Sequence, residues 1–239
     1  MLITRNRVLQ SAGIFAITLG FLASFMISTA QAESDAQTRG IEEVVVTAQK
    51  REQSLMDAAI DVTAFSGIQL RDAGIDDVFG ISKAIPGLTI QNTGANVQIF
   101  MRGVGTRITG TGLDSAVAVY VDDRFVTRQT GQVFDIYDVE RVEVLKGPQG
   151  VLFGRNSTGG AIRLITAEVS DDLEGELNFG FGSEDYQMAS GFVNVPVTDN
   201  FGIRISAQSR QRDAFKENIV PGAEDFDDLD AQSVRLKAR

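Results

Sequence analysis

The chain contains neither cysteine nor histidine. Without cysteine no disulfide can cross-link the fold, and thiolate chemistry is excluded. Without histidine the commonest general base and the commonest zinc ligand are both missing. Asp and Glu outnumber Lys and Arg by 32 to 22, so the formal net charge is -10. Because nucleic-acid phosphates are bound by Lys and Arg, we do not expect a nucleic-acid partner.

Residues 1–32 have the pattern of a secretory signal peptide. Arg5 and Arg7 precede an apolar run that is purest over residues 14–27, and Ala30-Gln31-Ala32 supplies a small-residue cleavage site. A membrane anchor is the alternative, but the run is short for a span of about 20 residues. Export together with the absence of cysteine suits a bacterial envelope protein that does not rely on disulfides.

Residues 33–57 are expected to form a flexible leader, because they begin and end in small and polar residues. Within the leader lies the segment Glu43, Val44, Val45, Val46, Thr47 and Ala48. A β-branched run between polar flanks is typical of an extended segment that adds a strand to the sheet of another protein. It is also compatible with an ordinary first strand of this domain.

Residues 58–167 predict a compact α+β module, which is a small mixed sheet with short helices. Ser66 and Gln69 have the spacing of a capping box, so a helix should begin there and end at Gly74. Asp76 is expected to cap a second helix, which Pro86-Gly87 ends. Strands are predicted at residues 88–91, 97–102, 116–121, 139–145 and 161–165.

Residues 168–239 change to a period-two alternation of apolar and polar side chains, as in residues 201–208. Such alternation fits the strands of a membrane β-barrel, and it also fits a soluble antiparallel sheet with one wet face. A tight turn at residues 197–200 and a long acidic connection at residues 213–231 favour the barrel. The strands are too few to close one, because the smallest membrane barrels have about eight. We therefore expect an incomplete barrel, from the N-terminal piece of a longer protein or from a truncated gene product.

Two sequence patterns invite a catalytic interpretation, and both have a simpler one. Tyr120-Val-Asp-Asp123 is similar to the paired-aspartate motif of reverse transcriptases, but neighbouring strand residues point to opposite faces. An Asp pair that ends a strand and opens a turn is the preferred interpretation. The glycines of residues 147–159 lack the Lys and Ser/Thr of a P-loop, and Ser157 has no histidine to activate it. We expect no catalytic residue, no metal site and no cofactor, so the protein is not expected to be an enzyme.

An acidic cluster near the C-terminus could bind Ca²⁺ through its carboxylates. It lacks the glycine and the spacing of an EF-hand loop, so a solvated acidic loop is preferred. The cluster consists of Glu224, Asp225, Asp227, Asp228 and Asp230.

The chain resembles the TonB-dependent outer-membrane receptors over nearly its whole length. Each motif alone is weak, but their order and spacing together are specific. The one departure is length, because the family closes a barrel of about 22 strands around its plug domain. The motifs are Glu43–Ala48, Ile85–Ile90, Met101–Gly103, Val119–Asp122, Val139–Gly150 and Gly159–Ile162.

The resemblance implies TonB-energised uptake of a scarce solute, siderophore-like or other, across the outer membrane. Residues 43–48 would be the TonB box, which adds a strand to the C-terminal domain of TonB. Residues 58–167 would be the plug, and residues 168–239 would be the first barrel strands, which contact outer-membrane lipid in the full-length form. The implied location is the cell outer membrane, with the plug facing the periplasm and the barrel lumen.

Loops at residues 92–96, 106–115 and 124–132 would face the solute. The alternative function is that of a plug-only interaction protein in the periplasm, which binds TonB or ligand without transport.

Overall fold

The computed structural model describes residues 45–46, 53–54, 60–93, 96–108, 114–216, 218–219 and 227–239. The predicted signal peptide and most of the predicted leader lie outside these residues. All described residues fall within one compact unit, Glu43–Arg239. In this part of the chain, every helix is too short or too polar to span a membrane.

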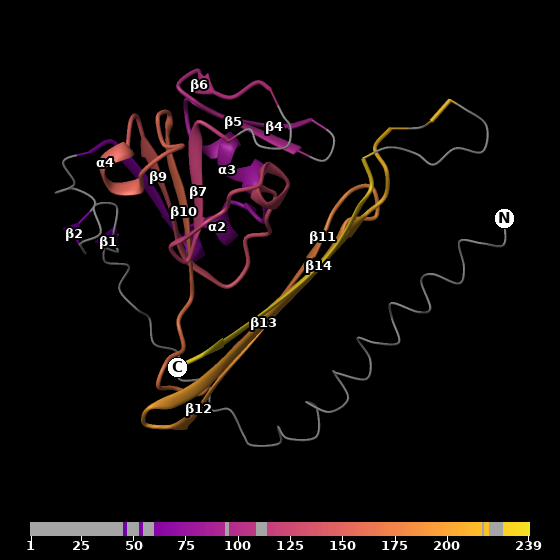
Figure 1. The fold of residues 1–239 in the computed structure, drawn as a ribbon. Coiled ribbons are helices and arrows are strands. Elements are labelled where there is room, and N and C mark those ends of the chain that lie inside the picture. The colour runs from indigo at the N-terminus through magenta and orange to yellow at the C-terminus, as the bar shows by residue number, and fades with distance from the viewer. Residues whose placement is uncertain are drawn as a thin grey trace. The chain divides into compact units, whose positions relative to one another are not determined.

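A mixed five-stranded sheet forms the centre of the N-terminal half (Figure 1). Its strand order is β3-β9-β10-β7-β8. β7 and β10 run parallel, and the other neighbours run antiparallel. The central strands are rich in Val, Ile and Leu because both of their faces are buried. The strands are β3 (Val62–Ser66), β7 (Val117–Val121), β8 (Arg124–Phe125), β9 (Val139–Lys146) and β10 (Gly160–Thr166).

One face of this sheet packs against two short helices and a small antiparallel sheet. The helices are α2 (Gly67–Asp72) and α3 (Val78–Ala84). The small sheet has the order β4 (Leu88–Thr93), β5 (Asn96–Met101) and β6 (Val104–Gly105). A 3-10 turn, η3 (Gln129–Gln132), lies beside β5. The larger core lies between these layers and includes Leu70, Val78, Ile81, Ile99, Met101, Val117, Val119, Val142, Val144, Ile162 and Leu164.

Local capping fixes where the two helices begin. The Ser66 hydroxyl accepts from the Gln69 amide at 3.3 Å, and the Gln69 side chain accepts from the Ser66 amide at 3.0 Å. The predicted capping box is therefore confirmed. The expected cap of the second helix is wrong by one residue, because Asp77 accepts from the Gly80 amide at 2.8 Å. Asp76 instead accepts a hydrogen bond from the Tyr186 hydroxyl.

The opposite face of the five-stranded sheet carries a smaller apolar cluster. Helix α4 (Gly150–Phe153) lies there, and the short strand β1 (Val45–Val46) pairs with β2 (Gln53–Ser54). The buried members of this cluster are Val46, Ala118, Leu145, Phe153 and Ala161.

Four long antiparallel strands form the rest of the described chain, which we call the C-terminal sheet (Figure 1). The strands follow one another in the order β11 (Glu174–Phe181), β12 (Gln187–Thr198), β13 (Phe201–Arg212) and β14 (Leu229–Ala238). Large apolar side chains alternate along them and are exposed on one face. They are Leu177, Phe179, Phe181, Val195, Val197, Phe201, Ile205, Val234 and Leu236.

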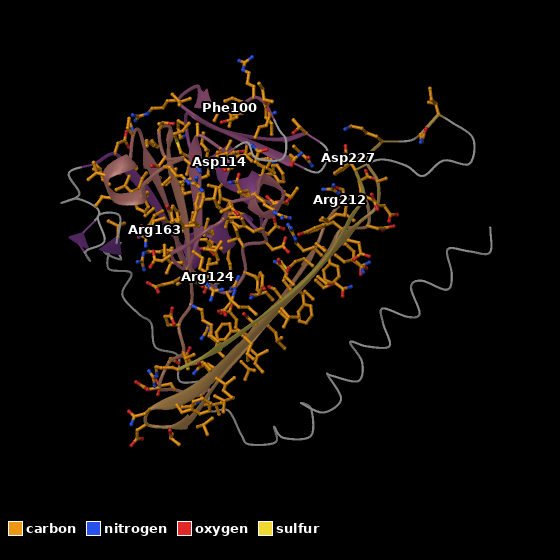
Figure 2. The ribbon with its side chains drawn as sticks, in the orientation of Figure 1. Phe100, Asp114, Arg124, Arg163, Arg212 and Asp227 are labelled. Atoms are coloured by element: carbon orange, nitrogen blue, oxygen red, sulfur yellow. The ribbon has the colours of Figure 1, made fainter. Side chains whose placement is uncertain are left out.

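The predicted fold class is confirmed: a mixed sheet with a few short helices is followed by antiparallel strands whose faces differ in polarity. The predicted acidic loop at residues 213–231 lies partly outside the described residues, as do Glu224 and Asp225. Within the described part, Asp227 pairs with Lys216, and its carbonyl accepts from Arg212 at 2.8 Å (Figure 2).

Replacement of Gly160 tests the packing at the centre of the main sheet. Gly160 begins β10 with φ +148°, and a Cβ atom there would lie 2.3 Å from the Leu145 carbonyl oxygen. Gly160→Ala should lower the free energy of unfolding by about 2–4 kcal/mol, because backbone strain and overpacking add. Gly150→Ala is the matched control, since a Cβ there meets nothing within 4 Å. Urea titration should give a lower unfolding midpoint for Gly160→Ala than for Gly150→Ala. Equal midpoints would contradict this packing.

Candidate functional site: a docking strand and a charged interface

The centre of the predicted docking segment, Val45–Val46, forms a short strand. Val45 pairs with Ser54 and Val46 with Gln53, both antiparallel. The Val46 side chain is fully buried and belongs to the apolar cluster around Phe153. Glu43, Val44, Thr47 and Ala48 lie outside the described residues. The described part of the segment is therefore paired to one neighbouring strand and anchored by one buried side chain.

Three carboxylates meet at one corner of the α+β module, which we call the acidic corner: Asp76, Asp77 and Asp135. Two segments that are far apart in the sequence form it. The Ile136 amide donates to the Asp76 carbonyl at 2.9 Å, and Asp77 and Asp135 form an isolated β-bridge. Carboxylates gathered this closely repel one another unless cations lie between them. Asp138 follows Asp135 by three residues, outside this corner, and adopts the left-handed backbone conformation with φ 47°.

The inner face of the C-terminal sheet supplies those cations. Because side chains alternate along a strand, the apolar outer residues of β13 and β14 leave polar and basic residues on the face toward the module. These inner residues line up in neighbouring registers, such as Arg204 beside Lys237. The basic stripe consists of Arg204, Arg210, Arg212, Arg235, Lys237 and Arg239.

Arg204 makes the most buried pair of this interface. Its Nε lies 3.0 Å and 3.2 Å from the two carboxylate oxygens of Asp138, and both side chains are less than a tenth exposed. The guanidinium also stacks on Phe192, with its carbon 3.7 Å from the ring centroid. Arg235 completes the contact, because its Nη1 donates to the Tyr137 carbonyl at 3.0 Å. These contacts hold the strained backbone of Asp138 in place.

Arg210 neutralises the acidic corner. Its Nη1 lies 3.2 Å from Asp76 and 3.5 Å from Asp77, and its Nη2 bonds to Asp135. Burial raises the pKa of Tyr186 to about 12, and the hydrogen bond to Asp76 acts in the same direction. The Tyr186 hydroxyl stays protonated at neutral pH and donates to Asp76. The Ser233 hydroxyl donates to Asp135 at 2.7 Å, so one cation and two hydroxyls serve three carboxylates.

A second set of contacts secures the segment between the two sheets. Lys237 lies 2.9 Å from Glu168 and donates to the Thr166 carbonyl at 3.2 Å. Asn194, which is fully buried on β12, donates to the Ser170 carbonyl at 3.1 Å and accepts from the Ser170 amide at 3.1 Å. The module and the C-terminal sheet are therefore joined by side-chain bonds at both ends of the interface.

The two aspartates of the Tyr120-Val-Asp-Asp123 pattern form a hairpin turn and serve different partners. Both have positive φ, 47° and 63°, as the tight β7–β8 connection requires. Asp122 accepts from the Thr166 amide and hydroxyl at 2.8 and 2.7 Å. Asp123 pairs with Arg163 at 2.7 Å, and Arg163 also pairs with the buried Glu143. The preferred interpretation of an Asp pair that ends a strand and opens a turn is confirmed.

The loops predicted to face a solute do not all lie together. Ser115 and Arg124 flank opposite ends of β7, and Figure 2 places Asp114 and Arg124 far apart in the module. Residues 94–95 and 109–113 lie outside the described residues. Arg124 follows the turn whose Asp122 lies near Lys237, at 3.6 Å. Arg124 therefore lies at the end of β7 opposite to Ser115.

Sequence reasoning missed the charged interface. The alternation of β13 and β14 puts Arg204, Arg235 and Lys237 on one face, so a basic face was visible in the sequence. Its acidic partners were not visible, because Asp76 and Asp135 are 59 positions apart and are brought together only by the fold.

A protein-family model and several known proteins are similar to parts of this chain. The model of the family described as TonB-dependent Receptor Plug Domain matches residues 54–161. The iron-regulated outer membrane virulence protein of Vibrio cholerae is 28% identical over 216 residues, which are 83% of this chain and 31% of that protein. The pesticin receptor of Yersinia pestis is 28% identical over 219 residues, which are 90% of this chain and 31% of that protein.

A solved structure has a similar fold. The ferric yersiniabactin uptake receptor FyuA from Yersinia pestis superposes with a TM-score of 0.69 at 27% identity, over 75% of this chain and 28% of that chain. This chain spans about a third of the length of the curated relatives that it matches, 31% in both cases above. The matched region includes the α+β module together with strands that follow it. On this evidence residues 54–161 match the plug domain of TonB-dependent receptors, and the chain is similar to outer-membrane receptors over 75–90% of its length.

Proposed function

We propose that the protein acts in the outer membrane as a receptor for TonB-energised uptake of a scarce solute. In this proposal the α+β module is the plug, and the C-terminal sheet is the first part of the wall of the barrel. The protein binds and admits a solute and catalyses no reaction.

The observation that carries the proposal is the two-sided character of the C-terminal sheet. Its outer face exposes a band of Leu, Phe, Val and Ile side chains, and Phe181 is 81% exposed. In water such a face on a sheet would promote aggregation. Against lipid hydrocarbon it is favourable, because strands of outer-membrane barrels alternate between apolar outward and polar inward residues. The periplasmic plug-only alternative leaves this face in water, so we favour the membrane receptor.

The charged interface explains how the plug is held against the wall. A buried ion pair is stable only when its geometry is good and its hydrogen bonds are satisfied. Arg204 and Asp138 meet this condition with two contacts at 3.0 and 3.2 Å and with the Phe192 ring below the guanidinium. Polar pairs, in contrast to an apolar core, can exchange for water when the two parts separate. Such an interface suits a plug that must close the barrel at rest and move during uptake.

The docking strand supports the TonB step of the proposal. The Val44-Val45-Val46 run is a ready segment for strand addition, in which backbone hydrogen bonds give affinity. Release of Val46 from its buried site would cost about 1.5–3 kcal/mol. If the segment can dock only after Val46 has left its buried site, it binds TonB about 10–150-fold more weakly than a segment that is already free. We infer that docking is weak at rest and strengthens when the segment leaves the Phe153 cluster.

The class of solute is suggested by the names of the relatives. One is called an iron-regulated outer membrane protein, and another is a ferric yersiniabactin uptake receptor. We therefore propose an iron chelate as the first class to screen. TonB and the solute are the expected partners, with outer-membrane lipid on the apolar face.

Replacement of Val45 tests the docking strand. Val45→Pro removes a backbone donor from the segment and should abolish binding to the C-terminal domain of TonB, because an added strand needs that donor. Val45→Ala is the matched control, since it shortens the side chain and keeps the donor, and it should bind within about threefold of the native chain. Pull-down or calorimetry with purified TonB domain measures the difference. Unchanged binding by Val45→Pro would exclude residues 43–48 as the docking strand.

Replacement of Arg210 tests the charged interface. Arg210→Met leaves Asp76, Asp77 and Asp135 without their shared cation and should lower the free energy of unfolding by about 3–5 kcal/mol. Arg212→Met, two residues further on the same face, removes a contact to an exposed loop and should cost less than about 1 kcal/mol. Denaturant unfolding in detergent provides both values. Equal losses for Arg210→Met and Arg212→Met would mean that neutralisation of the acidic corner is not the role of Arg210.

A further inference from the structure

Strands β9 and β10 are joined by residues 147–159, which we call the β9–β10 loop. Because the two strands are antiparallel neighbours, the loop begins and ends at adjacent points of the sheet, and the Gly147 amide donates to the Gly159 carbonyl at 3.1 Å. Hairpin loops usually have about 2–5 residues, so this one is long enough to form a small unit of its own. It contains helix α4, and the Gln149 amide donates to the Ser157 carbonyl at 2.8 Å across it.

The β9–β10 loop lies on the face of the sheet that also holds the docking strand. Helix α4 places Leu152 and Phe153 in the Phe153 cluster and leaves Val151 fully exposed. Val46 of β1 is buried in the same cluster. Because Phe153 is the largest of the buried members, a displacement of α4 leaves a space in the cluster that Val46 shares.

Tyr120 on β7 attaches the loop to the sheet. Its hydroxyl donates to the Phe153 carbonyl at 2.8 Å. This carbonyl belongs to the last turn of α4, where helix carbonyls have no partner within the helix. The Tyr120 ring also contacts the rings of Phe153 and Phe125, with centroids 5.4 and 5.5 Å apart. Burial raises the pKa of Tyr120, so its hydroxyl remains a donor at neutral pH.

The structure of the loop itself contributes little to keeping α4 in place. Helix α4 has four residues, and helices shorter than about 12–15 residues are marginal in water on their own. Among the described residues, its N-cap Gln149 forms no side-chain capping bond. The Phe153 cluster is also separate from the larger core on the other face of the sheet, so it can open while that core stays closed. Such small units open at a lower free energy than the whole fold.

We propose that the β9–β10 loop is a lid that keeps Val46 buried, and that the Tyr120 hydroxyl holds this lid closed through the Phe153 carbonyl. The proposal rests on the proposed function in one respect, which is that Val46 belongs to the segment that docks TonB. Tyr120 is a positioning residue, because it acts on the docking segment through α4. It sets the fraction of molecules in which the segment is free at rest.

The absence of cysteine makes the position of the lid measurable. Val46→Cys introduces a single thiol at a fully buried site, so a maleimide reacts with it only when the cluster opens. In the full chain in detergent, the addition of Tyr120→Phe should raise the labelling rate about fivefold, the effect of losing one neutral hydrogen bond. The rate should change little at low urea concentrations, because a local opening exposes little surface.

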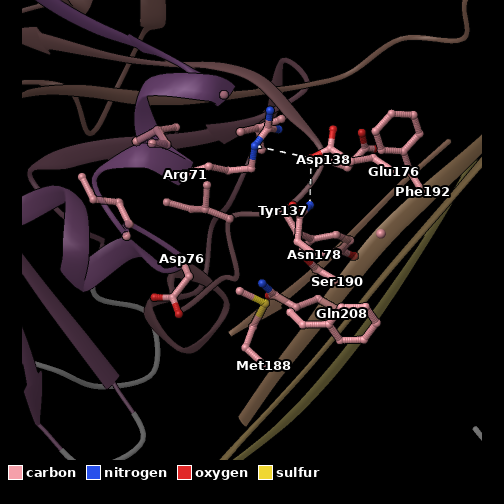
Figure 3. Close-up of a pocket in the computed structure, with 18 of the residues that line it drawn as sticks. Arg71, Asp76, Tyr137, Asp138, Glu176, Asn178, Met188, Ser190, Phe192 and Gln208 are labelled. Carbon is pink, nitrogen blue, oxygen red and sulfur yellow. Dashed lines mark hydrogen bonds and ion pairs between the residues drawn. The ribbon is translucent and has the colours of Figure 1, made fainter. Parts of the chain in front are cut away.

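Tyr186→Phe in the same Val46→Cys background is the matched control. It also removes one hydroxyl hydrogen bond, the one to Asp76. Tyr186 borders the cavity between α2 and the C-terminal sheet (Figure 3), and in the described part of the chain the residues around that cavity are not members of the Phe153 cluster. This variant should label at the rate of Val46→Cys alone, since its lost bond lies outside the lid.

Binding to the C-terminal domain of TonB gives a second readout. Tyr120→Phe without the cysteine should bind about fivefold more tightly than the native chain, because a larger fraction of molecules has the segment free. Tyr186→Phe should bind as the native chain does. Circular dichroism verifies that each variant is folded, and amide hydrogen exchange at Val46 makes the same comparison if Val46→Cys does not fold.

Equal labelling rates with and without Tyr120→Phe would overturn the proposal. Equal acceleration by Tyr120→Phe and Tyr186→Phe would also overturn it, because the hydroxyl would then contribute only to general stability. Faster labelling with unchanged TonB binding would support the lid and contradict docking through residues 43–48. Failure of this inference and failure of the proposed function are therefore distinguishable.

Discussion

The arrangement of this protein depends on the neutralisation of four aspartates by two arginines of β13. Asp76, Asp77 and Asp135 come from two segments that the backbone joins directly, through the Ile136 amide and the Asp76 carbonyl. Arg210 pairs with these three carboxylates, and Arg204 pairs with Asp138. The module and the C-terminal sheet are thus mutually dependent: each buries charges that would be unstable without the other.

The two faces of β13 lie in different surroundings, because side chains alternate along a strand. On β13, Ile205 is 45% exposed on the outer face, whereas Arg204 and Arg210 are 6% and 5% exposed on the inner face. A register slip of one residue would bury isoleucine against carboxylates and expose arginine to the apolar side. The ion pairs therefore fix the register of the wall as well as the seat of the plug.

Local features of the fold were predictable from the sequence, and long-range ones were not. The capping box at Ser66 and Gln69 depends on residues three apart, so its spacing predicts it. Asp76 and Asp77 are equally good caps on local grounds. Tyr186 and Arg210, more than 100 positions away, recruit Asp76 and leave the cap to Asp77. The acidic corner is a product of the same long-range packing, and alternation alone indicates only which side chains face inward.

The proposed docking strand must meet two opposing requirements. Strand addition needs accessible backbone groups, and β1 pairs only with β2 among the described strands. A stable resting state needs the apolar side chains covered, and Val46 is fully buried in the cluster with Leu145 and Phe153. Hydrogen bonds lie in the plane of a sheet and side chains stand perpendicular to it, so the two requirements act on different groups of the same residues. In the proposed mechanism, docking is therefore weak while Val46 is buried, and it strengthens once the cost of extracting Val46 has been met.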